Sequence, residues 1–301
     1  APSRGANGHS GGMPHTPVPF RGADLPEGFG LVVGNCQAES MRIVLDAADR
    51  PTLRVPPVHE MDAADVERLH ELLPRASFLV AQPVRDDYHG LRLGTRQLAA
   101  SLSSSARLVT FPVVRYAGLH PFQAALHVDG IDEVPPIVAY HDIRTLAAAA
   151  GLPTVSRPDR RTVRRIESDS LAELRRREAS IDVAASDLLR PSSAELMRTV
   201  NHPGNGVWLP LAERVLAALG LPGEPTDPGR PLLNAVRAPL EDWVVDAWGL
   251  PESPRRSWIV DGVEVDPSLV AEAHAEWYRA HPGFVAAATV RLRDMIGHWR
   301  E

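Results

Sequence analysis

The sequence of 301 residues contains no lysine, so all 32 of its basic residues are arginines. A phosphate-binding loop of the P-loop kind and a Schiff-base mechanism both need a lysine amine, and both are therefore excluded. The chain has a single cysteine, which cannot form a disulfide bond within the chain. An unpaired cysteine is typical of a reducing compartment, and we expect a cytoplasmic protein.

Long apolar runs are also missing, and we expect no transmembrane segment because such a helix needs about 20 consecutive apolar residues. A formal charge of −6 with 44% apolar residues indicates a globular protein that binds neither nucleic acid nor an anionic membrane. Residues 1–20 are rich in Gly and Pro and lack the apolar centre of a signal peptide. This segment is predicted to be a disordered tail or a cloning remnant.

Short apolar segments alternate with helical patterns between residues 29 and 114. The segments "GLVVGN", "TLRVPPV", "ASFLVAQPV" and "ARLVTFPVV" are expected to be strands, and the segments between them to be helices, with Asp62 capping the second helix. This alternation predicts an α/β fold with a parallel sheet flanked by helices on both faces.

The rest of the chain is expected to be more helical. An irregular stretch at 112–142 precedes three helical patterns, the last of which, "LPLAERVLAALGL", is expected to begin at Pro210. The Pro- and Gly-rich residues 223–231 indicate a linker. We expect an α/β catalytic domain at 29–222, followed at 223–301 by a mixed C-terminal appendage, with a hairpin around Asp261–Gly262 and two closing helices.

The single cysteine, Cys36, lies where the first strand is expected to become a helix. That position is the carboxyl edge of the sheet, where open α/β folds bind ligands. A helix N-terminus lowers the pKa of a thiol, which favours a reactive cysteine. The neighbouring Gly34, Asn35 and Gln37 form a loop that can hold an anion or a developing oxyanion. The alternative is a buried structural cysteine.

A second candidate is His202 in the segment "VNHPGNGVW". Because the residue before a proline is pushed out of helical geometry, His202 is expected on extended backbone just before a helix. Histidine is the side chain whose ordinary pKa best suits a general base near neutral pH. An ordinary turn residue is the alternative.

Four segments together carry a resemblance to a known family. "GNCQ" after the first strand, "AQPVRDDY" after the third, "FPVVRYAGLHP" after the fourth and "NHPGN" before a late helix occur in this order. The sequence resembles the WcbI-type capsular polysaccharide biosynthesis proteins over roughly residues 29–220. The resemblance implies a coenzyme A-binding protein that transfers an acyl group, on a fold comparable to the SGNH hydrolases.

In that comparison Cys36 takes the place of the nucleophilic serine and His202 that of the late-chain base. SGNH enzymes carry an acid three residues before the histidine, where this sequence has Thr199. Asp187 is considered as a substitute that would orient His202.

The other motif residues are assigned to coenzyme A or acyl-coenzyme A as co-substrate: Gln82, Arg85, Tyr88, Arg115, Tyr116, Asn201 and Asn205. The arginines suit phosphates because guanidinium groups donate forked hydrogen bonds, and the tyrosines are expected to flank the adenine or the pantetheine arm. The alternatives are that Arg85 pairs with Asp86 or Asp87 and that the tyrosines are core residues. No metal is expected.

The sequence therefore predicts an acyltransferase that acts on a hydroxyl or amine of a saccharide or small-molecule acceptor. Two mechanisms stay open: Cys36 takes the acyl group and passes it on, or His202 deprotonates the acceptor for direct attack. An esterase or thioesterase of the SGNH kind and a non-catalytic coenzyme A- or polysaccharide-binding protein are the alternative functions.

Overall fold

The computed structural model describes residues 18–22, 24–128, 130–131 and 133–297. The predicted tail at residues 1–17 lies outside the described residues. The prediction is wrong for residues 18–20, because Val18–Pro19 forms strand β1 beside β3 (Thr52–Arg54) and Phe20 is buried in the core.

The main sheet has five parallel strands in the order β1-β3-β2-β4-β5, with β2 at Gly30–Val33, β4 at Phe78–Ala81 and β5 at Arg107–Thr110. The chain runs outward from β2 to β3 and then crosses back to β4. The direction of winding therefore reverses between β2 and β4. In open α/β sheets, ligands bind at the carboxyl ends of the strands on the two sides of such a reversal.

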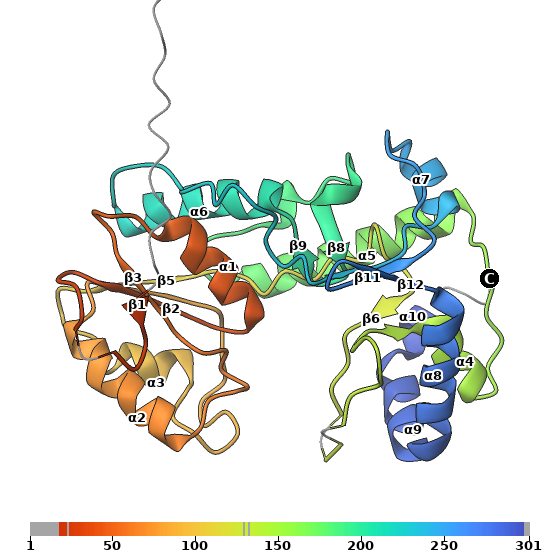
Figure 1. Cartoon of the computed structure of the whole chain (residues 1–301), viewed down its shortest axis with the longest axis horizontal. Helices are drawn as coiled ribbons and strands as arrows, with labels where there is room; N and C mark the ends of the chain where they lie inside the picture. The colour runs from red at the N-terminus through yellow and green to blue at the C-terminus, as the bar shows by residue number, and fades with distance from the viewer. Residues whose placement is uncertain (1–17, 23, 129, 132, 298–301) are drawn as a thin grey trace, which may run out of the picture.

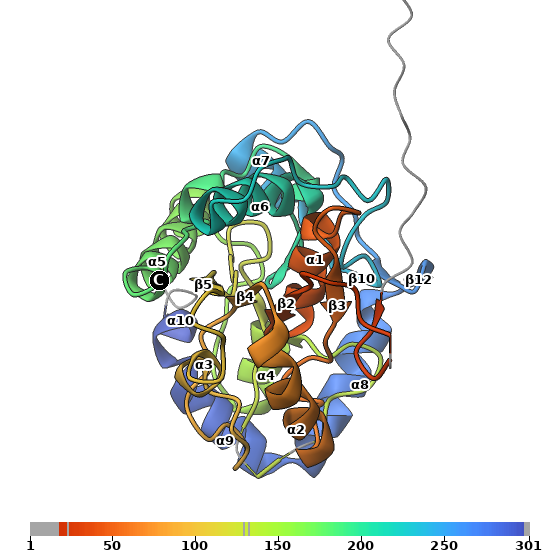
Figure 2. The same ribbon diagram turned by 90° about the vertical axis from the view of Figure 1, so that its left-hand side faces the viewer.

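Helices cover both faces of this sheet, as predicted: α1 (Cys36–Leu45), α2 (Ala63–Leu72), α3 (Thr95–Ala99) and α6 (Asn205–Leu219). Figure 2 shows α1 and α6 on one side of the sheet and α2 and α3 on the other. Val32 points into the core formed with α1 and α6, whereas its neighbour Leu31 points into the core formed with α2. Successive side chains of a strand face opposite ways, so one apolar strand serves both layers.

The remaining helices are α4 (Ile143–Ala149), α5 (Arg160–Glu178), α7 (Asp242–Trp248), α8 (Pro267–Ala280), α9 (Pro282–Arg291) and α10 (Arg293–Gly297), with 3₁₀ turns at Leu73–Arg75, Ser186–Leu188 and Ala194–Leu196. Short strands are β6 (Gln123–Ala124), β7 (His141–Asp142), β8 (Met197–Thr199), β9 (His202–Pro203), β10 (Val236–Arg237), β11 (Trp258–Val260) and β12 (Val263–Val265). Over the described ranges, no helix is long and apolar enough to cross a bilayer.

Figure 1 places the parallel sheet at one end of the molecule and α4 with α8 and α9 at the other. The predicted hairpin is confirmed, because β11 and β12 pair across Asp261 and Gly262, both of which have positive φ. Apolar side chains of the C-terminal segment, such as Tyr278 and Phe284, belong to the same core as α1 and α6. Residues 223–297 therefore have no separate core of their own.

The prediction that helix α6 begins at Pro210 is wrong. The helix begins at Asn205, so that Pro210 lies inside it. The first turn is held by contacts that the local sequence does not reveal. The Trp208 indole donates a hydrogen bond to the carbonyl of Pro203 over 3.0 Å. Asn205 bonds to the carbonyl of Arg230 and to the N–H of Leu232, and these tertiary contacts stabilise the turn although Pro210 cannot donate a helical hydrogen bond.

Candidate active site

The turn that carries Cys36 is built by its neighbours at the carboxyl end of β2. Asn35 caps α1, its Oδ1 accepting a hydrogen bond of 2.9 Å from the backbone N–H of Gln37. A Cβ atom at Gly34 would lie 2.3 Å from Oε1 of Gln82, so any other residue there would displace the Gln82 amide that bonds to the turn. The segment "GNCQ" is thus a tight strand-to-helix turn that begins α1 at Cys36.

Gln82 follows β4 and joins the two strand ends at the reversal of the sheet. Its Oε1 accepts a hydrogen bond of 2.9 Å from the backbone N–H of Asn35, and its Nε2 donates to Oε1 of Gln37 over 3.2 Å. The side chain is only 1% exposed. The prediction that Gln82 contacts the cofactor is wrong, because its side chain is enclosed and bonds to the backbone of the turn that carries Cys36.

Gln37 is fully buried and connects three segments of the chain. Its Nε2 donates hydrogen bonds of 2.7 Å to the carbonyls of both Val114 and Asn201, and its Oε1 accepts one of 2.9 Å from the N–H of Val114. Both hydrogens of the Gln37 side-chain amide therefore already have acceptors. The prediction that the Gln37 side chain holds an oxyanion is therefore wrong, and the residue instead fixes the loops around the site.

The Cys36 thiol is half-buried. Burial raises the pKa of Cys36, although the N–H groups of Cys36 and Gln37 act in the opposite direction, and the carboxylate of Glu60 adds to the rise. The predicted lowering of the thiol pKa by the helix N-terminus is wrong, because desolvation outweighs it. Cys36 is a protonated thiol at neutral pH.

His202 lies on the extended backbone of β9, which confirms the prediction from Pro203. Its Nε2 is 3.0 Å from the hydroxyl oxygen of Tyr140. Burial, together with the positive charge of Arg198, lowers the pKa of His202 to about 4. Within the described part of the chain, its Nδ1 is buried without a hydrogen-bond partner. His202 is therefore a neutral imidazole at pH 7.

Tyr140, which the sequence did not single out, brings the two candidates together. Its hydroxyl lies 3.0 Å from Nε2 of His202, and Cys36 is near enough that its thiolate form would raise the pKa of the phenol. Burial is the largest cause that raises the pKa of Tyr140, so the hydroxyl stays protonated. The residue lies in the irregular 112–142 stretch and carries no motif, so its role depends on partners that are distant in the sequence.

Among the described residues, no carboxylate is bonded to either ring nitrogen of His202. Asp187 forms a two-pronged ion pair with Arg214, with distances of 2.7 Å and 2.6 Å. The suggestion that Asp187 orients His202 is therefore wrong. Thr199 is buried and its hydroxyl donates to Oδ1 of Asn201 over 3.2 Å. The partner of His202 is a phenol rather than a carboxylate.

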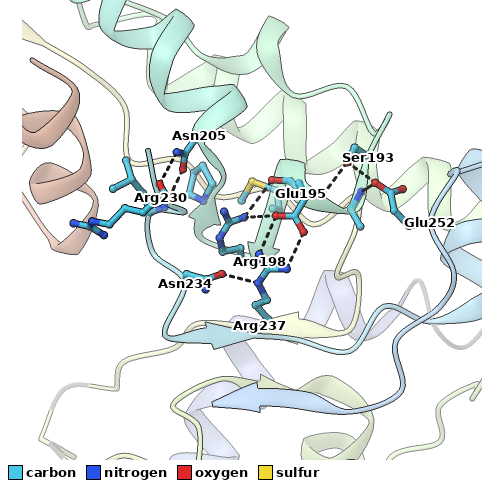
Figure 3. Close-up of polar contacts among 12 residues, drawn as sticks. Ser193, Glu195, Arg198, Asn205, Arg230, Asn234, Arg237 and Glu252 are labelled. Atoms are coloured by element: carbon cyan, nitrogen blue, oxygen red, sulfur yellow. Dashed lines mark hydrogen bonds and ion pairs between the residues drawn. The ribbon is translucent and has the colours of Figure 1, made fainter. Parts of the chain in front are cut away.

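The hairpin that carries His202 is anchored to the C-terminal segment (Figure 3). Arg198 on β8 is almost fully buried and lies 3.2 Å from the Glu195 carboxylate. The same carboxylate accepts two hydrogen bonds, of 2.8 Å and 3.0 Å, from Arg237 on β10. Arg198, which contributes to the low pKa of His202, is thus held in place through Arg237.

Arg85 and Tyr88 lie on the surface after β4. The guanidinium of Arg85 is exposed and lies 5.9 Å from the centre of the Tyr88 ring. Asp86 pairs with Arg96, and Asp87 accepts from a glutamine side chain. The alternative in which Arg85 pairs with either aspartate is therefore wrong. Arg85 is available to an anionic ligand.

Arg115 lies in a positive environment. Much of its side chain is exposed, yet neighbouring atoms shield the guanidinium, and this shielding with the charges of Arg177 and Arg291 lowers the pKa of Arg115. Like charges that approach one another in this way favour an anion between them. The role of Arg115 in phosphate binding stays a prediction.

Two other residues assigned to the cofactor are structural. Tyr116 is 0% exposed and its hydroxyl donates to Glu167 over 3.1 Å, so its ring cannot flank a ligand. Asn205 donates to the carbonyl of Arg230 and accepts from the N–H of Leu232, both over 2.9 Å (Figure 3). Both predictions are wrong. Asn201 is half-buried beside His202, and its carbonyl accepts the bond from Gln37.

Across the described ranges, no group of three or more His, Cys, Asp or Glu side chains is arranged to hold a metal ion.

Replacing Gln37 by alanine should destabilise the fold strongly, because buried backbone groups of Val114 and Asn201 lose their partners. Each such group costs about 1–3 kcal/mol, so we expect the free energy of unfolding to fall by at least about 3 kcal/mol. Urea denaturation measures this change. Gln97→Ala is the control, since two of the three groups that Gln97 contacts are exposed and water can satisfy them, so we expect a smaller loss. Equal losses in both variants would contradict the role given to Gln37.

Comparisons with known proteins show similarity to one family. The model of the family described as "polysaccharide biosynthesis enzyme WcbI" matches residues 29–224. Proteins of curated function give no significant match. A solved structure of WcbI matches with a TM-score of 0.75 and 20% identity, over 91% of this chain and 99% of that chain. That protein is described as a novel polysaccharide biosynthesis enzyme, in a native form without a disulfide bond between coenzyme A and one of its cysteines. At this identity the match shows the fold.

Proposed function

Because this chain belongs to the WcbI family of polysaccharide biosynthesis enzymes, we propose that it is a coenzyme A-dependent acyltransferase that acts on a hydroxyl or amine of a saccharide or small-molecule acceptor. The arrangement of Cys36, Tyr140 and His202 at the reversal of the sheet carries the proposal. It places a thiol, a phenol and a neutral imidazole at the edge where α/β folds bind ligands.

Coenzyme A is supported as the co-substrate by the cysteine. The solved WcbI structure is described by reference to a disulfide bond between coenzyme A and a cysteine. This chain has one cysteine, so a counterpart can only be Cys36. We expect the coenzyme A thiol to lie beside Cys36, with the phosphates on exposed arginines such as Arg85 and Arg115.

The charge states favour direct transfer. Nucleophilic attack by cysteine needs the thiolate, and the raised pKa of Cys36 keeps that fraction small. His202 is neutral and can accept a proton. As the acceptor oxygen bonds to the acyl carbon, its proton passes to the Tyr140–His202 pair. The carbon–sulfur bond breaks, and the departing coenzyme A thiolate takes that proton back, so that the pair returns to its neutral state.

The hydrolase alternative is less well supported. The late position of His202 and the place of Cys36 after β2 are compatible with a relationship to SGNH hydrolases. Hydrolytic triads, however, use a buried carboxylate to stabilise the imidazolium. In such triads the carboxylate bonds to Nδ1, whereas in His202 the phenol of Tyr140 contacts Nε2 and Nδ1 has no partner among the described residues, so no carboxylate there offsets a positive charge.

Coenzyme A should raise the melting temperature of the wild-type protein, because a ligand that binds the folded state stabilises it. Arg85→Ala should weaken this shift by removing a phosphate contact. Arg92→Ala removes another exposed arginine and should leave the shift unchanged. If calorimetry finds no binding of coenzyme A at millimolar concentrations, the proposed function fails.

Cys36→Ser distinguishes the two routes of transfer. Under direct attack the variant should keep substantial turnover, and intact-mass analysis of the wild type with acetyl-coenzyme A should show no adduct. If Cys36 carries the acyl group, turnover should be nearly lost and an adduct removable by hydroxylamine should appear. A trapped acyl-Cys36 would refute the direct route.

His202→Ala should lower turnover by at least about 100-fold, the lower limit for general-base catalysis. Because only neutral His202 accepts a proton and its pKa is about 4, wild-type kcat/KM should stay level from pH 7 to about 5 and fall only as pH approaches 4. An acid limb near the ordinary histidine pKa of about 6.5 would show that the imidazole is not held as described. Near-wild-type turnover of His202→Ala would exclude the proposed site.

A further inference from the structure

A cavity of about 690 Å³ lies next to the candidate active site and shares one wall with it. Tyr140, whose hydroxyl contacts His202, lines this cavity. The other walls come from residues 119–123, the start of α4, α7, the start of β11 and α8. The volume lies within the range of about 300–1,000 Å³ that is typical of small-molecule sites.

Aromatic rings form part of the walls. The rings of Trp258 and Tyr140 are stacked, with centres 6.3 Å apart and an angle of 24° between their planes. Phe122 and Trp243 meet edge to face at 5.3 Å. All four line the cavity. Aromatic faces of this kind pack well against the C–H face of a sugar ring.

The charged side chains of the lining balance one another: Asp142, Glu241 and Asp242 are acidic, and Arg144, Arg255 and Arg256 are basic. Arg144 bonds to Asp142 over 2.6 Å and to Glu241 over 3.0 Å, and its guanidinium lies 3.9 Å from the centre of the Phe122 ring. These contacts fix the orientation of the Arg144 guanidinium group. A cavity of balanced charge does not favour the phosphates of coenzyme A, which suit the surface around Arg85 and Arg115 better.

Two lining residues, His120 and Arg255, each have a buried side-chain nitrogen without a hydrogen-bond partner among the described residues. The Nη2 of Arg255 donates to the carbonyl of Ala238 over 2.6 Å. Its Nε, in contrast, is buried and has no hydrogen-bond partner among the residues that the structure describes. A buried donor without a partner is costly, but this nitrogen is closed to water, so it offers no direct contact to a hydroxyl in the cavity.

We infer that this cavity binds the acceptor as a neutral saccharide unit, with Tyr140 at the junction of the cavity and the Cys36–His202 site, where its hydroxyl contacts His202. The inference rests on the proposed function and assigns the acceptor a place in it. Sugar hydroxyls both donate and accept, so they match a lining that presents carboxylates, guanidinium groups and the Gln123 amide together. The apolar side of the ring matches the aromatic walls.

The test uses the full chain and a panel of methyl glycosides of neutral hexoses, deoxyhexoses and N-acetylhexosamines, with methyl glucuronide as a charged comparison. Saturation-transfer NMR titrations measure binding to the wild type. Ala271→Trp on α8 places an indole in the cavity without removing a hydrogen bond, and should weaken binding of a neutral glycoside by at least about tenfold. Thr145→Phe on α4 fills the cavity from a different element and should act alike.

Ala280→Trp is the matched control, because Ala280 is exposed at the end of α8 and does not line the cavity. Calorimetry measures the affinity of every variant for coenzyme A, which reports both correct folding and an intact coenzyme A site. This affinity should be unchanged in all three variants. The inference is overturned if no neutral glycoside binds at millimolar concentrations, if methyl glucuronide binds more tightly, or if both cavity-filling variants bind as the wild type does. Loss of coenzyme A binding by the wild type would instead refute the proposed function and leave the glycoside result to decide the cavity.

Discussion

The hydrogen bonds of the Gln37 amide are the constraint on which the site depends. They join the turn after β2, the loop after β5 and the β8–β9 hairpin, which are distant from one another in the sequence. In a buried environment each of these bonds is obligatory, because an unpaired backbone group there costs more than a single bond contributes. Cys36 lies in the first of these segments and His202 in the last. Their proximity is therefore a consequence of one fully satisfied side chain.

The same burial that makes these bonds necessary determines the charge states of the reacting groups. It raises the pKa of Cys36 and Tyr140 and lowers that of His202, so all three are neutral at pH 7. Desolvation opposes every ionised form, and no carboxylate of the described ranges bonds to His202 to stabilise an imidazolium. Such a site is poorly suited to forming a thiolate nucleophile. It suits a reaction whose leaving group is already a good one, and a coenzyme A thioester supplies such a group.

The sequence predicts those features that neighbouring residues determine. The parallel sheet follows from apolar runs buried on both faces, the start of α2 from the cap at Asp62, and the extended backbone at His202 from Pro203. The roles of Gln37 and Tyr116 could not be predicted, because a polar side chain has the same identity whether it faces a ligand or the core. Only its partners decide, and these come from elsewhere in the chain. Tyr140 was missed for the same reason.

The C-terminal segment shows how far such distant partners extend. The family model ends at residue 224, whereas the structural match covers 91% of the chain and so includes part of this segment. Arg237 holds Glu195, which in turn holds Arg198, a residue whose charge lowers the pKa of His202. Trp258 stacks on Tyr140, the partner of His202. Through these contacts the C-terminal segment contributes to the low pKa of the imidazole and packs against the phenol, so changes to it should also change the candidate site.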